Sequence, residues 1–263
     1  MTAGPALLFC PADRADRYGK AAAASDSVIL DLEDAVAPAD KESARAALIA
    51  SDLDPARTIV RVNPRTSGLL ELDLEAVRRT GYTTLMLAKT ETVDDLRALD
   101  GFDVIALCES PLGVRNAETF ASHDAVVGLT WGAEDLVAAL GGTSSRRADG
   151  RYRNFALHAR SRILIAAGSE GKPAYDTVHL DIADDAGLAE EAADAAASGF
   201  AGALCIHPRQ VEVLRAAFAP TAESVRWAGA VVDAAGTAPG VFTFEGRMVD
   251  EPVLRQARRI LGL

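Results

Sequence analysis

The sequence has few cysteines and no long apolar stretch, and each shortage excludes a class of protein. Its three cysteines, Cys10, Cys108 and Cys205, lie in or beside short apolar runs. An odd number without metal-binding spacing argues against a disulfide framework, and a buried cysteine usually packs as a small apolar side chain. No apolar stretch approaches the roughly 20 residues that cross a membrane. We therefore expect reduced cysteines and no membrane partner.

Targeting and nucleic-acid signals are also missing. The first residues do not form a basic segment followed by a long apolar core, so we expect no secretion signal and a cytoplasmic location. The formal net charge is −11, and no basic stripe accompanies it. Because such a chain repels nucleic acid and anionic lipid, neither is an expected partner. No Gly-x-Gly-x-x-Gly loop follows an apolar run, so a dinucleotide-binding fold has little support.

Eight short apolar runs recur along the chain, and each ends in polar or charged residues. They lie at 6–10, 28–30, 59–60, 85–87, 104–108, 125–133, 177–180 and 203–206. Continuous apolar runs are typical of buried parallel strands. Segments of helical spacing stand between several of them, at 94–99, 188–198 and 211–218. This alternation predicts an α/β fold, a (β/α)8 TIM barrel, with an open doubly wound sheet as the alternative.

Two segments interrupt the alternation. Residues 141–150 form a charged, Gly/Ser-rich insertion before a helix expected to begin near Tyr152. Such a loop is often a lid or ligand clamp, and the alternative is a disordered connector. The residues after Pro220 follow a complete barrel and hold a helix expected at 224–234, then a final helix after Pro252. We predict a catalytic barrel over 1–220 and a C-terminal extension over 221–263.

Carboxylates stand at the ends of two central runs. Glu109 directly follows the run 104–108, and Glu134 and Asp135 directly follow the run 125–133. The carboxyl ends of parallel strands are where α/β enzymes place their chemistry. Two carboxylates there suit one hard cation such as Mg²⁺, which prefers oxygen ligands. The alternative is a pair of solvated loop acids, but the polar residues at one end of every run favour a site.

Basic residues gather at two places near predicted strand ends. They are Arg14, Arg17 and Lys20 in the first, and Arg146, Arg147, Arg151 and Arg153 in the second. Most such clusters are solvated surfaces. Because they lie near strand ends, the alternative is that they hold the phosphates of a small anionic ligand.

Short motifs in a fixed order carry a resemblance that covers nearly the whole chain. They are LFCPADR at 8–14, ILDLED at 29–34, RVN at 61–63, LAK at 87–89, CES at 108–110, GAEDL at 132–136, IHPRQ at 206–210 and GRMVDEP at 246–252. Together they resemble the citrate lyase beta-subunit-like branch of the HpcH/HpaI aldolase superfamily. That family usually has Gly at the position of Ala12.

The resemblance implies a Mg²⁺-dependent lyase that makes or breaks a carbon–carbon bond beside a thioester. Relatives cleave citryl-, malyl- or citramalyl-type thioesters into an acetyl-type thioester and a 2-oxo acid. The implied metal ligands are Glu109 and Asp135, with Mn²⁺ as a possible replacement for Mg²⁺, and Glu109 thereby also contacts the substrate. The implied small-molecule partners are a CoA thioester and a 2-oxo acid.

Other residues acquire roles from the same resemblance. Arg61 is expected to bind the substrate carboxylate or the enolate oxygen through its planar fork of donors, and Arg14 to bind substrate. Glu33 and Asp34 are expected to hold the metal-bound waters. Lys89 is expected to add positive charge near the substrate, and the alternative for it is an ion pair at the strand end with Asp31 or Glu33.

The resemblance also implies a base on the C-terminal extension. In related malyl-CoA lyases an Asp reaches into the site from a neighbouring subunit, and the matching residue here is Asp250. This role for Asp250 implies that the extension is a lid and an oligomer contact, and that the active form is a homotrimer or a hexamer. From its local sequence alone, Asp250 is only a cap at a helix start.

Two alternative functions stay open within the resemblance. One is the beta subunit of a multi-subunit citrate lyase, which acts on a thioester of an acyl carrier protein. The other is an aldolase that cleaves free hydroxy-oxo acids without CoA.

Overall fold

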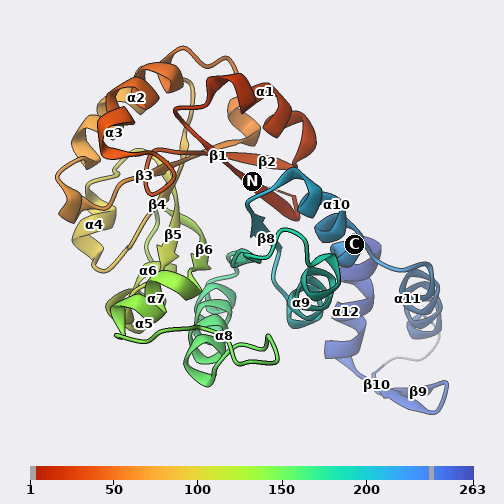
Figure 1. The fold of residues 1–263 in the computed structure, drawn as a ribbon. Helices are drawn as coiled ribbons and strands as arrows, with labels where there is room; N and C mark the ends of the chain where they lie inside the picture. Colours follow the sequence, from red (N-terminus) through yellow and green to blue (C-terminus); the bar gives the residue numbers. More distant parts are fainter. Residues whose placement is uncertain (1–3, 237–239) are drawn as a thin grey trace. The chain divides into compact units, whose positions relative to one another are not determined.

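The computed structural model describes residues 4–236 and 240–263, and its chain divides into two compact units, 1–218 and 219–263. In the first unit, eight parallel strands pair in sequence order and β1 pairs with β8, so the sheet is closed. Figure 1 shows helices around these strands. The predicted (β/α)8 barrel is confirmed, and the open doubly wound sheet is excluded because an open sheet has no pairing between its first and last strands.

The strands of the barrel are short and mostly buried along their whole length. They are β1 (Ala6–Pro11), β2 (Ser27–Asp31), β3 (Thr58–Val62), β4 (Thr84–Leu87), β5 (Asp103–Cys108), β6 (Val126–Trp131), β7 (Ala174–Asp176) and β8 (Gly202–Cys205). Side chains of Leu7, Ile29 and Ile59 pack in a cluster separate from the one beneath the helices, because alternate residues of a strand point to opposite faces. This inner cluster fills the barrel as a packed core.

The helices lie between the strands along the chain, with three 3-10 turns. The helices of the first unit are α1 (Ala15–Ala24), α2 (Lys41–Ile49), α3 (Leu70–Val77), α4 (Val93–Arg97), α5 (Pro111–Arg115), α6 (Ala117–Ala121), α7 (Ala133–Ala139), α8 (Asn154–Ser169), α9 (Asp185–Ser198) and α10 (Pro208–Phe218). The 3-10 turns are η1 (Pro38–Asp40), η2 (Pro55–Arg57) and η3 (Arg65–Ser67). None of the helices in the described ranges is long and apolar enough to span a membrane.

Two helix boundaries agree with the signals in the sequence. Thr92 is the cap residue before α4, where its N–H donates to the side chain of Asp95 over 2.8 Å. Gly199 follows α9 with a φ of 105°, a left-handed conformation that a side chain disfavours. Glycine therefore ends α9 where the sequence predicts the end.

The prediction of the seventh strand was wrong. Residues 177–180 have no regular structure, and the strand lies at Ala174–Asp176. Tyr175 pairs with Thr130 of β6 and with Gly202 of β8, whereas Leu180 is half exposed. The apolar run therefore belongs to the loop after the strand, because Asp176 accepts the N–H of Thr177 and the chain leaves the sheet there.

The sixth strand also ends earlier than its apolar run. It stops at Trp131, and Gly132 is the cap residue of α7. The run continues across this boundary because Ala133, the first helical residue, is itself buried.

The loop at 141–150 is held by specific contacts. Ser145 is 2% exposed, and its hydroxyl donates to Glu134 Oε1 over 2.6 Å. The guanidinium of Arg146 stacks over the ring of Tyr152 at 3.9 Å and pairs with Glu191. These contacts anchor the loop at Ser145 and Arg146, while its other residues are exposed. A function as a lid or clamp stays a prediction.

The second unit has a small core of its own. It contains α11 (Ala222–Ala235), β9 (Phe242–Phe244), β10 (Arg247–Val249) and α12 (Glu251–Leu261), and β9 and β10 form an antiparallel pair. Ala228, Val231, Val249, Leu254 and Ala257 are buried together. The roles assigned to 221–263, a lid and an oligomer contact, stay predictions.

Candidate functional site

Charged side chains from five consecutive strand ends meet at the carboxyl end of the barrel. They are Asp31 at the end of β2 with Glu33 and Asp34 after it, Arg61 in β3, Lys89 after β4, Glu109 after β5 and Asp135 in the first turn of α7 after β6. Consecutive parallel strands place their carboxyl ends side by side, so the contacts below follow from the strand order.

Arg61 is paired with two carboxylates. Its Nε and Nη2 donate to the two carboxylate oxygens of Asp31 over 2.7 and 2.6 Å, and Nη1 lies 3.2 Å from Glu33 Oε2. Its guanidinium also lies 4.7 Å from the ring centre of Phe9. Burial alone would lower the pKa of Arg61, but Asp31 and Glu33 raise it above its ordinary value. The pair with Asp31 follows from the strand register, because Asp31 is the register partner of Arg61 on β2.

Lys89 links the carboxylates after β2 with Asp135 after β6. Its ammonium contacts Glu33, lies 3.2 Å from Asp34 Oδ2 and lies 3.6 Å from Asp135 Oδ1. The ion pair with Glu33 that the sequence left as an alternative is therefore present. Burial alone would lower the pKa of Lys89, but Glu33, Glu109 and Asp135 raise it above its ordinary value.

The backbone of Lys89 is part of the site as well. Its φ is 48°, a left-handed conformation that is uncommon outside glycine. In this conformation its N–H donates to Glu109 Oε1 over 3.0 Å. Strained backbone of this kind gathers at functional sites, and here it fixes the position of a buried carboxyl group.

Glu109 is the most deeply buried carboxyl of the predicted metal pair. The residue is 4% exposed. Burial first, and then the negative charge of Asp135, raise the pKa of its carboxyl to about 8 against the opposing charges of Lys89 and Arg61. Glu109 and Asp135 are therefore close enough to repel each other, which is the arrangement that a shared cation relieves.

Gly132 makes room for Glu109. A Cβ at Gly132 would lie 2.7 Å from Glu109 Oε2 and 2.9 Å from Glu109 Cβ, closer than real Cβ atoms approach. Only glycine fits between β6 and α7 with Glu109 in this position. Gly132 was not among the functional residues predicted from the sequence, although a glycine directly before a helix that carries a candidate ligand is a usable signal.

Glu33 connects Arg61 and Lys89. It is 3% exposed, contacts both cations, and accepts the N–H of Asp34 over 2.9 Å. Burial raises the pKa of Glu33, and Arg61 and Lys89 partly offset the rise. Asp34 is the exposed member of the group, with 62% of its side chain accessible.

The donor set fits a Mg²⁺ ion. Five carboxyl groups, those of Asp31, Glu33, Asp34, Glu109 and Asp135, surround only two cations, Arg61 and Lys89. Within the described ranges, no three His, Cys, Asp or Glu side chains form a closed metal cage. Mg²⁺ does not need one, since it usually binds one or two carboxylates and completes its shell with water and substrate oxygens.

Two predicted residues make other contacts. Arg14 precedes α1 and forms an exposed ion pair with Asp16 at 3.1 Å. Asp250 belongs to the second unit, where its Oδ1 accepts the N–H of Val253 over 3.3 Å and caps α12. The local expectation for Asp250, a helix cap, is confirmed, and its catalytic role stays a prediction.

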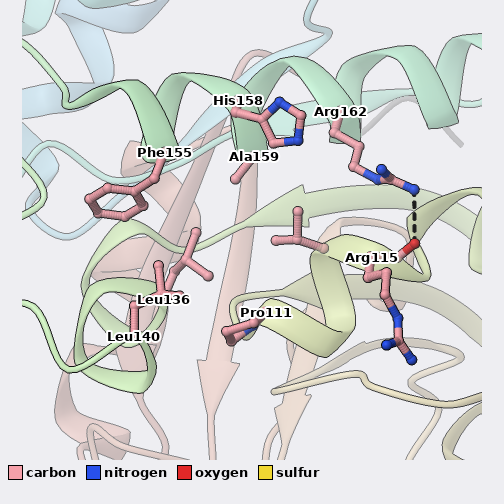
Figure 2. Close-up of a pocket in the computed structure, with 9 residues that line it drawn as sticks. Pro111, Arg115, Leu136, Leu140, Phe155, His158, Ala159 and Arg162 are labelled. Atoms are coloured by element: carbon pink, nitrogen blue, oxygen red, sulfur yellow. Dashed lines mark hydrogen bonds between the residues drawn. The ribbon is translucent and has the colours of Figure 1, made fainter.

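An apolar cavity of about 340 Å³ lies elsewhere, among α5, α7 and α8. Figure 2 shows Leu136, Leu140 and Phe155 along it, with Arg162 donating to the carbonyl of Arg115 at one end. None of the charged residues of the barrel mouth lines this cavity.

Comparisons with known proteins agree on one family. The HpcH/HpaI aldolase/citrate lyase family model matches residues 6–208. A citrate lyase subunit beta-like protein of Mycobacterium tuberculosis is 54% identical over 98% of this chain and 95% of its own length. The mitochondrial citramalyl-CoA lyase of Homo sapiens is 31% identical over 98% of this chain and 84% of its own length.

A solved structure is similar over almost the whole chain. It is the CitE protein of Mycobacterium tuberculosis in complex with magnesium, acetoacetate and coenzyme A. The two chains are 53% identical and superpose with a TM-score of 0.95, covering 98% of this chain and 97% of the other.

Proposed function

The chain belongs to the HpcH/HpaI aldolase/citrate lyase family and is a lyase of that family, and we propose that it is a Mg²⁺-dependent carbon–carbon lyase for CoA thioesters. In this proposal it cleaves a citryl-, malyl- or citramalyl-like 3-hydroxyacyl-CoA into an acetyl-type thioester and a 2-oxo acid, or runs the reverse condensation.

One observation carries the proposal. Glu109 and Asp135 lie with Lys89 at the carboxyl end of the barrel. The same fold in CitE, at a TM-score of 0.95, is the one solved with magnesium, acetoacetate and coenzyme A. A carboxylate pair beside two cations is suited to an anionic 2-oxo acid and a divalent ion together.

The metal would be held by Glu109 and Asp135. When bound, Mg²⁺ supplies Lewis-acid polarisation of the oxygens of the 2-oxo acid. Gly132 keeps Glu109 in place, and the N–H of Lys89 fixes one of its carboxyl oxygens.

Arg61 and Lys89 would bind and orient the substrate. Asp31 and Glu33 fix the orientation of the planar guanidinium of Arg61. The N–H groups that these contacts do not use are left for a substrate oxygen. A fixed planar donor set orients a carboxylate or an enolate oxygen better than a mobile cation does. We assign Arg14, at the start of α1, to the substrate as well.

Cleavage needs a base that takes up a proton, and we assign this role to Asp250. The base takes the proton of the 3-hydroxyl group, the carbon–carbon bond breaks, and the 2-oxo acid forms. The bonding electrons go to the α-carbon of the thioester, which takes up a proton to give the acetyl-type thioester. In this assignment the C-terminal extension acts on a neighbouring barrel, and the active form is a homotrimer or a hexamer.

The experiment is a cleavage panel with the purified chain. Citryl-, malyl- and citramalyl-CoA, a citryl thioester of an acyl carrier protein and free hydroxy-oxo acids are each incubated with Mg²⁺. The products are identified by mass spectrometry, with Glu109→Gln as the inactive control. We expect at least one substrate to yield a 2-oxo acid and an acetyl-type CoA. Cleavage of the acyl-carrier-protein thioester alone would favour the citrate lyase subunit, and cleavage of free hydroxy-oxo acids alone would favour a CoA-independent aldolase.

A further inference from the structure

Lys41, the first residue of α2, is a buried lysine whose three donors are all used. The residue is 8% exposed. Its Nζ donates to the carbonyl oxygens of Leu32 and Glu33 over 2.6 and 2.7 Å, and to Asn63 Oδ1 over 3.1 Å. An ammonium group has three N–H donors, so this one is fully satisfied. Burying a charge is costly unless hydrogen bonds compensate for it. The groups that accept these hydrogen bonds are therefore the ones whose positions Lys41 fixes.

The partners of Lys41 belong to the backbone around Glu33. No ion pair among the described residues involves Lys41, so its charge acts on neutral oxygens. The N–H of Glu33 donates to Asp31 Oδ1 over 2.8 Å, and its carbonyl oxygen accepts from both Lys41 and the N–H of Val36. These hydrogen bonds thus fix the peptide groups on both sides of Glu33.

Asn63 extends this support to the next strand. Its Nδ2 donates to the carbonyl of Leu32 over 2.8 Å and to Asp73 Oδ2 over 2.6 Å. Asp73 is fully buried and also pairs with Arg45 of α2. Asn63 stands two residues after Arg61, so one polar network joins the ends of β2 and β3.

We propose that Lys41 is a positioning residue for the lyase site, holding the loop after β2 so that Glu33 stays between Arg61 and Lys89. Lys41 touches neither the predicted metal ligands nor the two cations and acts through Glu33. Loss of the ammonium removes one hydrogen bond from each of the two carbonyl groups, which keep only Asn63 and Val36 as donors. The loop then relaxes, and Glu33 no longer fixes the directions of Arg61 and Lys89. The catalytic part of this inference rests on the proposed function.

The first test needs no substrate. Amide hydrogen exchange is followed in Lys41→Met at a temperature far below unfolding. We expect the N–H groups of Glu33, Ala35 and Val36, which are hydrogen-bonded within this loop, to exchange about tenfold faster or more. The matched control is Lys172→Met, because Lys172 also donates to a backbone carbonyl, that of His123, over 2.8 Å. Unchanged exchange in the loop would overturn the proposal.

The second test is a double-mutant cycle with Glu33→Gln. Lys41→Met is expected to lower kcat about tenfold or more with little change in KM for the thioester, and to have a much smaller effect when Glu33 is already Gln. A purely structural residue would act equally in both backgrounds, and that result would overturn the proposal. If Lys41→Met does not fold, Lys41→Gln replaces it in both tests. An inactive wild-type chain would contradict the proposed function alone, because the exchange experiment is independent of substrate.

Discussion

At the scale of single residues, Glu109 and Asp135 carry the metal prediction. Their carboxyl groups lie close enough for the charge of Asp135 to raise the pKa of Glu109. We predict that Glu109→Gln or Asp135→Asn abolishes measurable Mg²⁺ binding, because an amide supplies no charge to a hard cation. Calorimetric titration measures the affinity, and circular dichroism checks that the fold is intact. Wild-type affinity in both variants would contradict this site.

Arg61 carries a second prediction at this scale. Its guanidinium holds Asp31 through two donors and Glu33 through a third nitrogen. Lysine keeps the charge but cannot copy this fork. Hydrogen bonds to charged groups are worth roughly 1.5–3 kcal/mol, so we expect Arg61→Lys to lower turnover about ten- to hundredfold. Near-normal steady-state turnover would mean that charge alone suffices at this position.

Individual site residues differ in how far the sequence predicts them. Glu109 could be proposed because it directly follows an apolar run, and Asp135 because it stands in the acidic pair after the next run and matches the metal motif of the family. The pairing of Arg61 with Asp31 could not, because it depends on the register of two strands 30 residues apart in the chain. Lys41 gave no signal, since its role depends on burial against carbonyl groups that no sequence pattern marks.

At the scale of elements, the junction of β6 and α7 leaves no room for a side chain beside Glu109. Gly132 stands at the junction, and an added Cβ would overlap Glu109. We predict that Gly132→Ala displaces Glu109 and weakens Mg²⁺ binding about tenfold, as changes next to metal ligands usually do. The matched control is Gly168→Ala in α8, where an added Cβ meets nothing within 4 Å. Equal Mg²⁺ affinity of the two variants in calorimetry would contradict this reading of Gly132.

Strands were predicted well where the apolar run lies within the strand itself, and poorly where a neighbouring stretch is more apolar than the strand. The runs that gave β1, β2 and β5 are continuous and buried, so their ends located the site. β7 has three residues, Ala174, Tyr175 and Asp176, and the more apolar stretch after it drew the prediction forward. Which of two adjacent stretches pairs with β6 and β8 depends on barrel closure, a contact between distant parts of the chain.

At the scale of the whole molecule, the second unit is what distinguishes this lyase from a bare barrel. Asp250 caps α12 there and is the proposed base. We predict that Asp250→Asn lowers kcat by about two to four orders of magnitude, the usual contribution of a general base, with little loss of Mg²⁺ affinity. Asparagine is itself a good helix cap, so the fold should persist. Unimpaired turnover would remove Asp250 from the mechanism.

The same variant tests whether the unit acts across a subunit boundary. Mixing Asp250→Asn with Glu109→Gln protomers would place an intact Asp250 beside an intact Glu109 in some sites of a mixed oligomer. We expect part of the activity to return after subunit exchange. No recovery, with exchange verified by mass spectrometry, would mean that Asp250 serves its own barrel.

The central claim is that this chain cleaves a CoA thioester through a metal held by Glu109 and Asp135. The most direct measurement follows release of the 2-oxo acid from the best 3-hydroxyacyl-CoA in one sample, first with Mg²⁺, then after excess EDTA, then after Mg²⁺ is restored. The rate should fall to background with EDTA and recover fully with Mg²⁺, and the Glu109→Gln chain should stay at background throughout. Release that continues unchanged in EDTA would contradict the claim.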